Sequence, residues 1–94
     1  MAGQVSASGV IERGSGFRVR SSEPGVYTIT FDKRYFPSGC GAMVVAAMSA
    51  PLVPVVSQDN LCGGTFHVIL YIPGGSFTAG EFQFIAREDA PQHS

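Results

Sequence analysis

The sequence predicts an all-β fold, specifically a single antiparallel β-sandwich (jelly-roll-like) of about seven or eight strands. Glycine and proline recur at intervals of roughly ten residues, which is the spacing of turns in a sandwich or barrel. The segments between these turns are rich in Val, Ile, Thr, Phe and Tyr, which suit a pleated surface, and none carries a helical period. A chain of 94 residues has room for one core of this kind.

The segments expected to form strands are, in chain order, 10–13, 17–22, 26–32, 42–49, 53–57, 65–72 and 81–87. The third alternates most clearly, because Tyr27, Ile29 and Phe31 point to one side while polar residues point to the other. The second and last strands alternate in the same way, so these apolar faces are expected to build the core. The domain is expected to consist of an N-terminal arm over residues 1–8, the sandwich over 9–88 and a C-terminal tail over 89–94.

Two of the expected strands, 42–49 and 65–72, are apolar on both faces. A sandwich has only two layers, so the outer face of each sheet should be wet. The sequence therefore predicts a homo-oligomer in which another copy covers these strands, since no helix is available to do so. The residues expected at the oligomer interface are Met43, Val45, Met48, Ile69 and Tyr71. The alternative is that small alanines on an outer face need no partner.

The charge distribution argues against nucleic-acid and membrane partners. Charged residues make up 14% of the chain and the net charge is -1. The Lys and Arg residues are scattered, except that Arg18 stands near Arg20 and Lys33 beside Arg34, whereas nucleic acid and anionic membranes call for a basic stripe. The first residues lack the basic and apolar regions of a secretory signal peptide, and the most apolar run, 42–56, is too short to cross a bilayer.

The two cysteines, Cys40 and Cys62, each lie beside glycine in an expected loop. A disulfide between them would stabilise the domain by about 3 kcal/mol through the loop it closes. Assembly in the cytosol would keep both thiols reduced, so the sequence leaves both states open. Neither cysteine stands at a spacing typical of metal ligands, and no metal site is expected.

The sequence does not favour catalysis. His67 lies in the middle of an apolar strand and His93 in a polar tail, and no serine has the flanking residues of a nucleophile elbow. The carboxylates are dispersed and fall mostly at strand ends, where charges normally face water. We therefore expect neither enzymatic activity nor a cofactor.

Two loops are the best candidates for ligand binding. Asp59 and Asn60 form the strongest polar cluster and could contact a sugar hydroxyl or a Ca²⁺ ion, although a simple Asx turn is the more economical explanation. Tyr35 and Phe36 precede a proline and could present an aromatic surface to a sugar or to a neighbouring subunit, or form a corner of the core.

Several segments resemble a β-module of bacteriophage tail fibres and related phage-particle surface proteins. A Gly-x-Gly-Phe-x-Val strand at 14–19 leads to a Gly-Val-Tyr-Thr-Ile-Thr-Phe strand at 25–31, and Tyr-Phe follows at 35–36. The segment 82–86, Phe-Gln-Phe-Ile-Ala, resembles the closing strand of such modules. The resemblance implies a small sandwich that forms a trimer at a fibre tip or on a particle surface. In some members, end loops bind a host surface or a glycan.

These observations lead to one expected function and one alternative. We expect a non-enzymatic structural or binding module of a phage-like particle, trimeric and in contact with other virion proteins, which would be assembled in the host cytoplasm. No coiled-coil, collagen-like or shaft segment precedes the module, which favours a stand-alone particle component, such as a capsid decoration protein, or a separately encoded adhesin over a fibre tip. The alternative is a carbohydrate-binding, lectin-like adhesin that recognises host-surface glycans.

Overall fold

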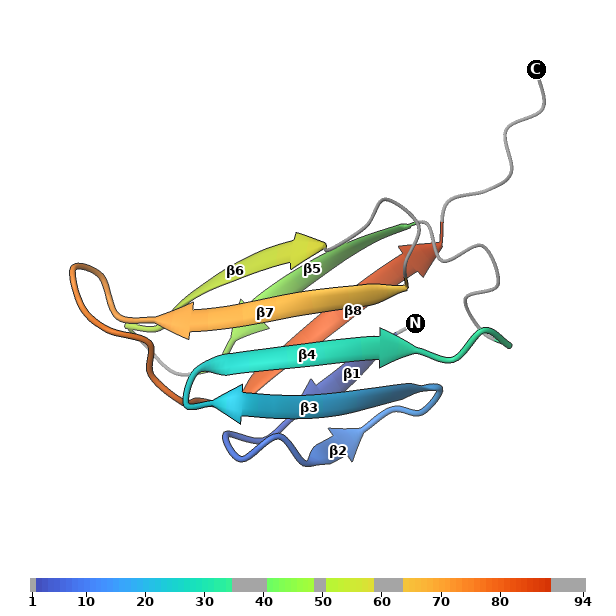
Figure 1. The fold of residues 1–94 in the computed structure, drawn as a ribbon, viewed down its shortest axis with the longest axis horizontal. Helices are drawn as coiled ribbons and strands as arrows, with labels where there is room; N and C mark the ends of the chain where they lie inside the picture. The colour runs from blue at the N-terminus through green and yellow to red at the C-terminus, as the bar shows by residue number, and fades with distance from the viewer. Residues whose placement is uncertain (1, 35–40, 49–50, 59–63, 89–94) are drawn as a thin grey trace, which may run out of the picture.

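The chain forms eight β-strands in the computed structural model, which describes residues 2–34, 41–48, 51–58 and 64–88 (Figure 1). The strands are β1 (Ala2–Val5), β2 (Ile11–Arg13), β3 (Phe17–Glu23), β4 (Val26–Phe31), β5 (Gly41–Ala47), β6 (Val53–Gln58), β7 (Thr65–Tyr71) and β8 (Phe82–Glu88). No helix of the described part is long and apolar enough to pass through a membrane. The all-β class predicted from turn spacing and strand composition is confirmed.

The strands form two antiparallel sheets of four that lie against each other (Figure 1). Sheet A has the order β2-β1-β8-β5 and sheet B the order β3-β4-β7-β6. Consecutive strands pair within one sheet as β1 with β2, β3 with β4, and β6 with β7. The architecture is thus a sandwich, but its hairpins distinguish it from a jelly roll, in which consecutive strands alternate between the sheets.

Aromatic side chains from both sheets meet in the core. Phe17 of β3 lies edge-on to Phe84 of β8, with ring centroids 4.9 Å apart, and Tyr27 of β4 packs on Phe82 at 5.0 Å. Such contacts add to the gain from burying apolar area. The buried hydrophobic residues of the described part are Val5, Phe17, Tyr27, Ile29, Phe31, Met43, Phe66, Val68, Leu70, Phe82, Phe84 and Ala86. The expected core faces of strands β3, β4 and β8 are therefore confirmed.

The N-terminal segment is part of the sandwich, so the expectation of an arm over residues 1–8 is wrong. β1 lies inside sheet A, between β2 and β8. Its sequence hides this role because Gly3 breaks the apolar pattern. A Cβ at Gly3 would lie 2.6 Å from the ring of Phe17 and 2.8 Å from that of Phe84. The small residue is needed because two core rings press on the strand.

The hydroxyl of Tyr27 ties two loops to the core. It donates a hydrogen bond of 2.6 Å to the carbonyl oxygen of Ala7 and accepts one of 3.3 Å from the backbone N–H of Gly80. The side chain is completely buried. A buried phenol needs such partners, because an unpaired polar group in the core would cost about 1–3 kcal/mol.

Candidate functional site: the outer face of sheet A

The outer face of sheet A presents a row of apolar side chains that no described residue covers. Val44 of β5 stands opposite Ile85 of β8, and Ile85 stands opposite Ala2 of β1. Val44 is 71% exposed and Ile85 67% exposed, although each lies on a strand whose alternate residues enter the core. Exposed valine and isoleucine side by side form the start of an apolar patch rather than an isolated surface residue.

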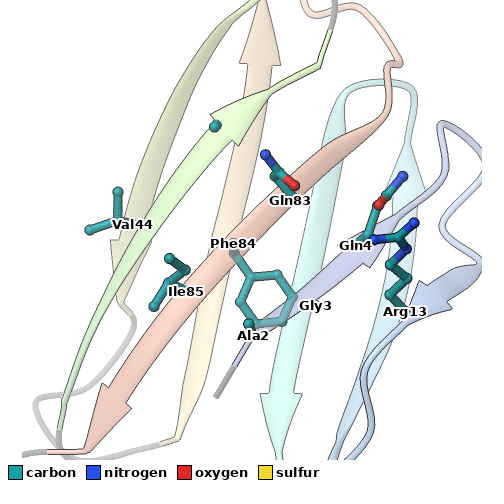
Figure 2. A pocket seen from close by; sticks show the side chains of 9 residues that line it. Ala2, Gly3, Gln4, Arg13, Val44, Gln83, Phe84 and Ile85 are labelled. Carbon is teal, nitrogen blue, oxygen red and sulfur yellow. The ribbon is translucent and has the colours of Figure 1, made fainter.

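A second row, in which three of the four residues are polar, lies next to the apolar one. Ala46, Gln83, Gln4 and Arg13 follow one another across β5, β8, β1 and β2. The two rows line a shallow hollow of about 370 Å³. Figure 2 shows Val44 and Ile85 toward one side of this hollow and the amide and guanidinium groups toward the other. The face can therefore contribute apolar area and hydrogen bonds to the same contact.

The edges of the two sheets differ in how they are protected against pairing with another chain. β6 carries Pro54, which has no N–H to donate, and β3 carries the charged Arg18 and Arg20. β2 is only three residues long. β5, by contrast, runs for seven residues without a charge or a proline, and β8 is its one ladder partner among the described strands. The edge of β5 is therefore the one best suited to accept a further strand.

The structure changes the set of residues expected at the interface. Met43 is a core residue, 9% exposed, and Val45 packs against the core, so the expectation that they face outward is wrong. Met48 is exposed in the single chain, so it is still a candidate interface residue. Ile69 and Tyr71 are half-buried on the outer face of sheet B. Sequence reasoning did not identify Val44 and Ile85 as interface residues, because only the register between β5 and β8 brings them together.

A pair of carboxyl groups lies at one end of the same face. Gln4 Nε2 donates a hydrogen bond of 3.1 Å to Glu81 Oε1. Glu81 also raises the pKa of Glu12 above its ordinary value of 4.5, because protonated Glu12 can share a hydrogen bond with the Glu81 side chain, while loss of hydration and repulsion between the two charges disfavour its ionised form. Arg13 opposes the shift.

This pair predicts that the Glu12→Gln variant has a higher melting temperature than the wild type at pH 7. A carboxyl whose pKa is raised by folding destabilises the folded state when it is ionised, and the penalty is absent once the pH falls below 4.5. Thermal melts at pH 7 and at a pH below 4.5 measure the rise in melting temperature and its disappearance in acid. Glu23→Gln on sheet B removes the same charge without touching the pair. An equal gain in both variants would show that only net charge matters.

One histidine of the described part contacts a threonine on the neighbouring strand. His67 on β7 is half-buried, and its Nδ1 lies 3.1 Å from Thr28 Oγ1 on β4. Within residues 2–34, 41–48, 51–58 and 64–88, no three His, Cys, Asp or Glu side chains lie together as metal ligands would.

The other residues singled out from the sequence lie outside the described residues, namely Tyr35, Phe36, Asp59, Asn60, Cys40, Cys62 and His93. The candidate ligand loops are therefore not tested and stay predictions, and the redox state of the two cysteines stays open. No family model, curated protein or solved structure matches this chain.

Proposed function

We propose that the protein is a non-enzymatic structural module that associates with further copies of itself through the edge of β5 and the outer face of sheet A. The observation that supports this most strongly is the pairing of Val44 and Ile85, 71% and 67% exposed, beside an edge strand that lacks charge and proline. In the proposed contact, β5 of one copy lies antiparallel to β5 of another, and the two A sheets become continuous.

The free energies of the individual contacts favour an interface that combines the outer face of sheet A with the edge of β5. Full burial of a valine or isoleucine contributes about 1.5–3 kcal/mol. Two such side chains from each copy give a total of the same order as the cost of association, about 4–15 kcal/mol. Backbone hydrogen bonds along β5, at about 0.5–1.5 kcal/mol each, then decide the balance. Association is therefore expected to depend on concentration.

The proposed setting is the surface of a phage-like particle. This part of the proposal is supported by the resemblance of the segments 14–19, 25–31 and 82–86 to phage surface modules. Pairing of β5 about a two-fold axis gives a dimer, whereas the resemblance implies a trimer, in which each copy uses two different surfaces. The measured mass of the assembly separates these two arrangements.

The proposal predicts that Val44→Lys abolishes self-association without unfolding the domain. The ammonium group would be desolvated in the contact but remains in water in the single chain, since Val44 is exposed there. Light scattering over a concentration series should give a rising mass for the wild type and a monomer mass for the variant. Circular dichroism of both should show the same β-structure.

Val55→Lys is the matched control. Val55 is an exposed valine on β6, at the outer face of sheet B, so the same substitution there leaves sheet A intact. A wild type that stays monomeric at every concentration would refute the proposal. Equal dissociation in both lysine variants would show that sheet A is not the contact.

A further inference from the structure

The outer face of sheet B carries an ordered group of basic and hydroxyl side chains. Arg18 lies opposite Thr30, and Arg20 lies opposite Thr28, across the ladder between β3 and β4. The rows continue onto β7, where Thr65 follows Thr30 and His67 follows Thr28. We call these residues the basic grid: Arg18, Arg20, Thr28, Thr30, Thr65 and His67.

The positive charge of the chain is concentrated around this grid. Of the 6 Lys and Arg residues of the chain, Arg18, Arg20, Lys33 and Arg34 belong to the β3–β4 hairpin or the turn that follows it. Neither Arg18 nor Arg20 forms an ion pair with any described residue. Both guanidinium groups are exposed and keep their donors available.

The carboxylate of Asp32, which follows β4, is engaged by Arg34. Asp32 Oδ1 accepts a hydrogen bond of 2.9 Å from the backbone N–H of Arg34, and Arg34 Nη2 lies 3.3 Å from Asp32 Oδ2. These bonds lower the pKa of Asp32, and Arg18 contributes to the shift from a distance. Asp32 thus interacts more strongly with Arg34 than with Arg18.

Two hollows meet at the grid. One, of about 410 Å³, is lined by Arg18, Val19, Arg20, Thr28 and Thr30. The other, of about 330 Å³, lies where β3 begins and β4 ends, and it shares Arg18 and Thr30 with the first. Both hollows are open to solvent and have Arg18 and Thr30 in common, so a ligand that occupies both must be extended rather than compact.

We infer that the basic grid binds an acidic saccharide, a sugar polymer that carries carboxylate or sulfate groups. Arg18 and Arg20 lie two residues apart on one face of a strand, so their Cα atoms are about 7 Å apart. Each can grip one oxyanion with its planar pair of donors. The Thr30 hydroxyl beside them can both donate and accept a hydrogen bond, and the Thr28 hydroxyl, already 3.1 Å from His67 Nδ1, can still accept one from a sugar hydroxyl.

The two hollows are poorly suited to single-stranded nucleic acid. Binding of that kind relies on exposed aromatic rings on which bases stack. The aromatic residues that line the two hollows are Phe17 and Phe31, which are 6% and 5% exposed and belong to the core.

Binding of defined polymers to the full chain tests the inference. The probes are dextran sulfate, polygalacturonate as the carboxylated polymer, uncharged dextran and a single-stranded oligothymidylate, measured by biolayer interferometry at one fixed salt concentration. We expect at least one acidic polysaccharide to bind, and uncharged dextran not to bind. The response of the two acidic polymers shows whether the site prefers sulfate or carboxylate.

The double variant Arg18→Ala/Arg20→Ala should lose more than about tenfold in affinity for the acidic polymer. Arg87→Ala is the control, because Arg87 is an exposed arginine on the outer face of sheet A. Arg20→Lys keeps the charge but not the paired donors, so its affinity for the acidic polymer should lie between those of the wild type and the double variant. Thermal melts establish that all variants are folded.

Three results would overturn the inference: no binding of either acidic polymer, equal losses in the double variant and in Arg87→Ala, or tighter binding of oligothymidylate than of both polysaccharides. The test is independent of self-association, because Val44→Lys leaves the grid intact. Loss of oligomers with retained binding would refute the proposed function alone. The reverse result would refute this inference alone.

Discussion

Replacing Gly25 with alanine is expected to lower the free energy of unfolding by about 3 kcal/mol or more. Gly25 lies in the turn between β3 and β4 with a φ of 84°, and it is buried. A Cβ there would lie 2.7 Å from the backbone nitrogen of Thr78 and 2.9 Å from the carbonyl oxygen of Leu70. Both are backbone atoms and cannot rotate away. Urea denaturation measures the loss.

Gly74→Ala separates the two causes of this effect. Gly74 has a φ of 73°, but a Cβ there would meet nothing within 4 Å. This variant should cost only the strain of the left-handed backbone, about 1–2 kcal/mol. If the urea midpoints of the two variants coincide, close packing of the β3–β4 turn against the segment after β7 is not what holds this end of the sandwich.

The second large effect is expected from Phe84→Ala, which should lower the free energy of unfolding by about 3–5 kcal/mol. Phe84 is 2% exposed, and its ring contacts those of Phe17 and Phe31, with centroids 4.9 and 5.9 Å away. Truncation would leave a cavity between the sheets that these rigid rings cannot fill. Denaturant titration followed by circular dichroism measures the change.

Gln83→Ala on the same strand is the control for Phe84→Ala. Gln83 is exposed on the outer face of sheet A, so its truncation should change stability by less than about 0.5 kcal/mol. Comparable losses at the two positions would mean that the alternation of β8 between core and solvent is not as described.

The sequence predicts those strands best in which polar residues mark the wet face. Tyr27, Ile29 and Phe31 are separated by threonines, and all three are buried as expected. Arg18 and Arg20 likewise mark the outer side of β3. Period-two alternation is a local signal, so a single strand carries enough information to place its core face.

The same signal fails where every position is apolar or where a glycine interrupts it. The run around Met43 contains no polar residue to mark solvent, so its phase is set by pairing with β8, where Val44 meets Ile85. Long-range register of this kind is not visible in one sequence. β1 is hidden for another reason, since Gly3 is dictated by the rings of the opposite layer and of the neighbouring strand.

The candidate sites were likewise predictable only where a local pattern within one strand defines them, and not where they depend on strand register. The basic pair on β3 is visible in the sequence, but its alignment with Thr28 and His67 needs two strand pairings, one of them between segments far apart in the chain. The apolar excess of the segment 42–49 predicts self-association, and yet the side chains that would carry it are identified only by the register.

A dilution series of methyl spectra by nuclear magnetic resonance tests the central proposal most directly. If copies associate through sheet A, the methyl signals of Val44 and Ile85 should shift or broaden as concentration rises, while that of Val55 on the opposite sheet stays in place. If the mass of the assembly increases over the concentration range while the signals of Val44 and Ile85 stay unchanged, the account is contradicted.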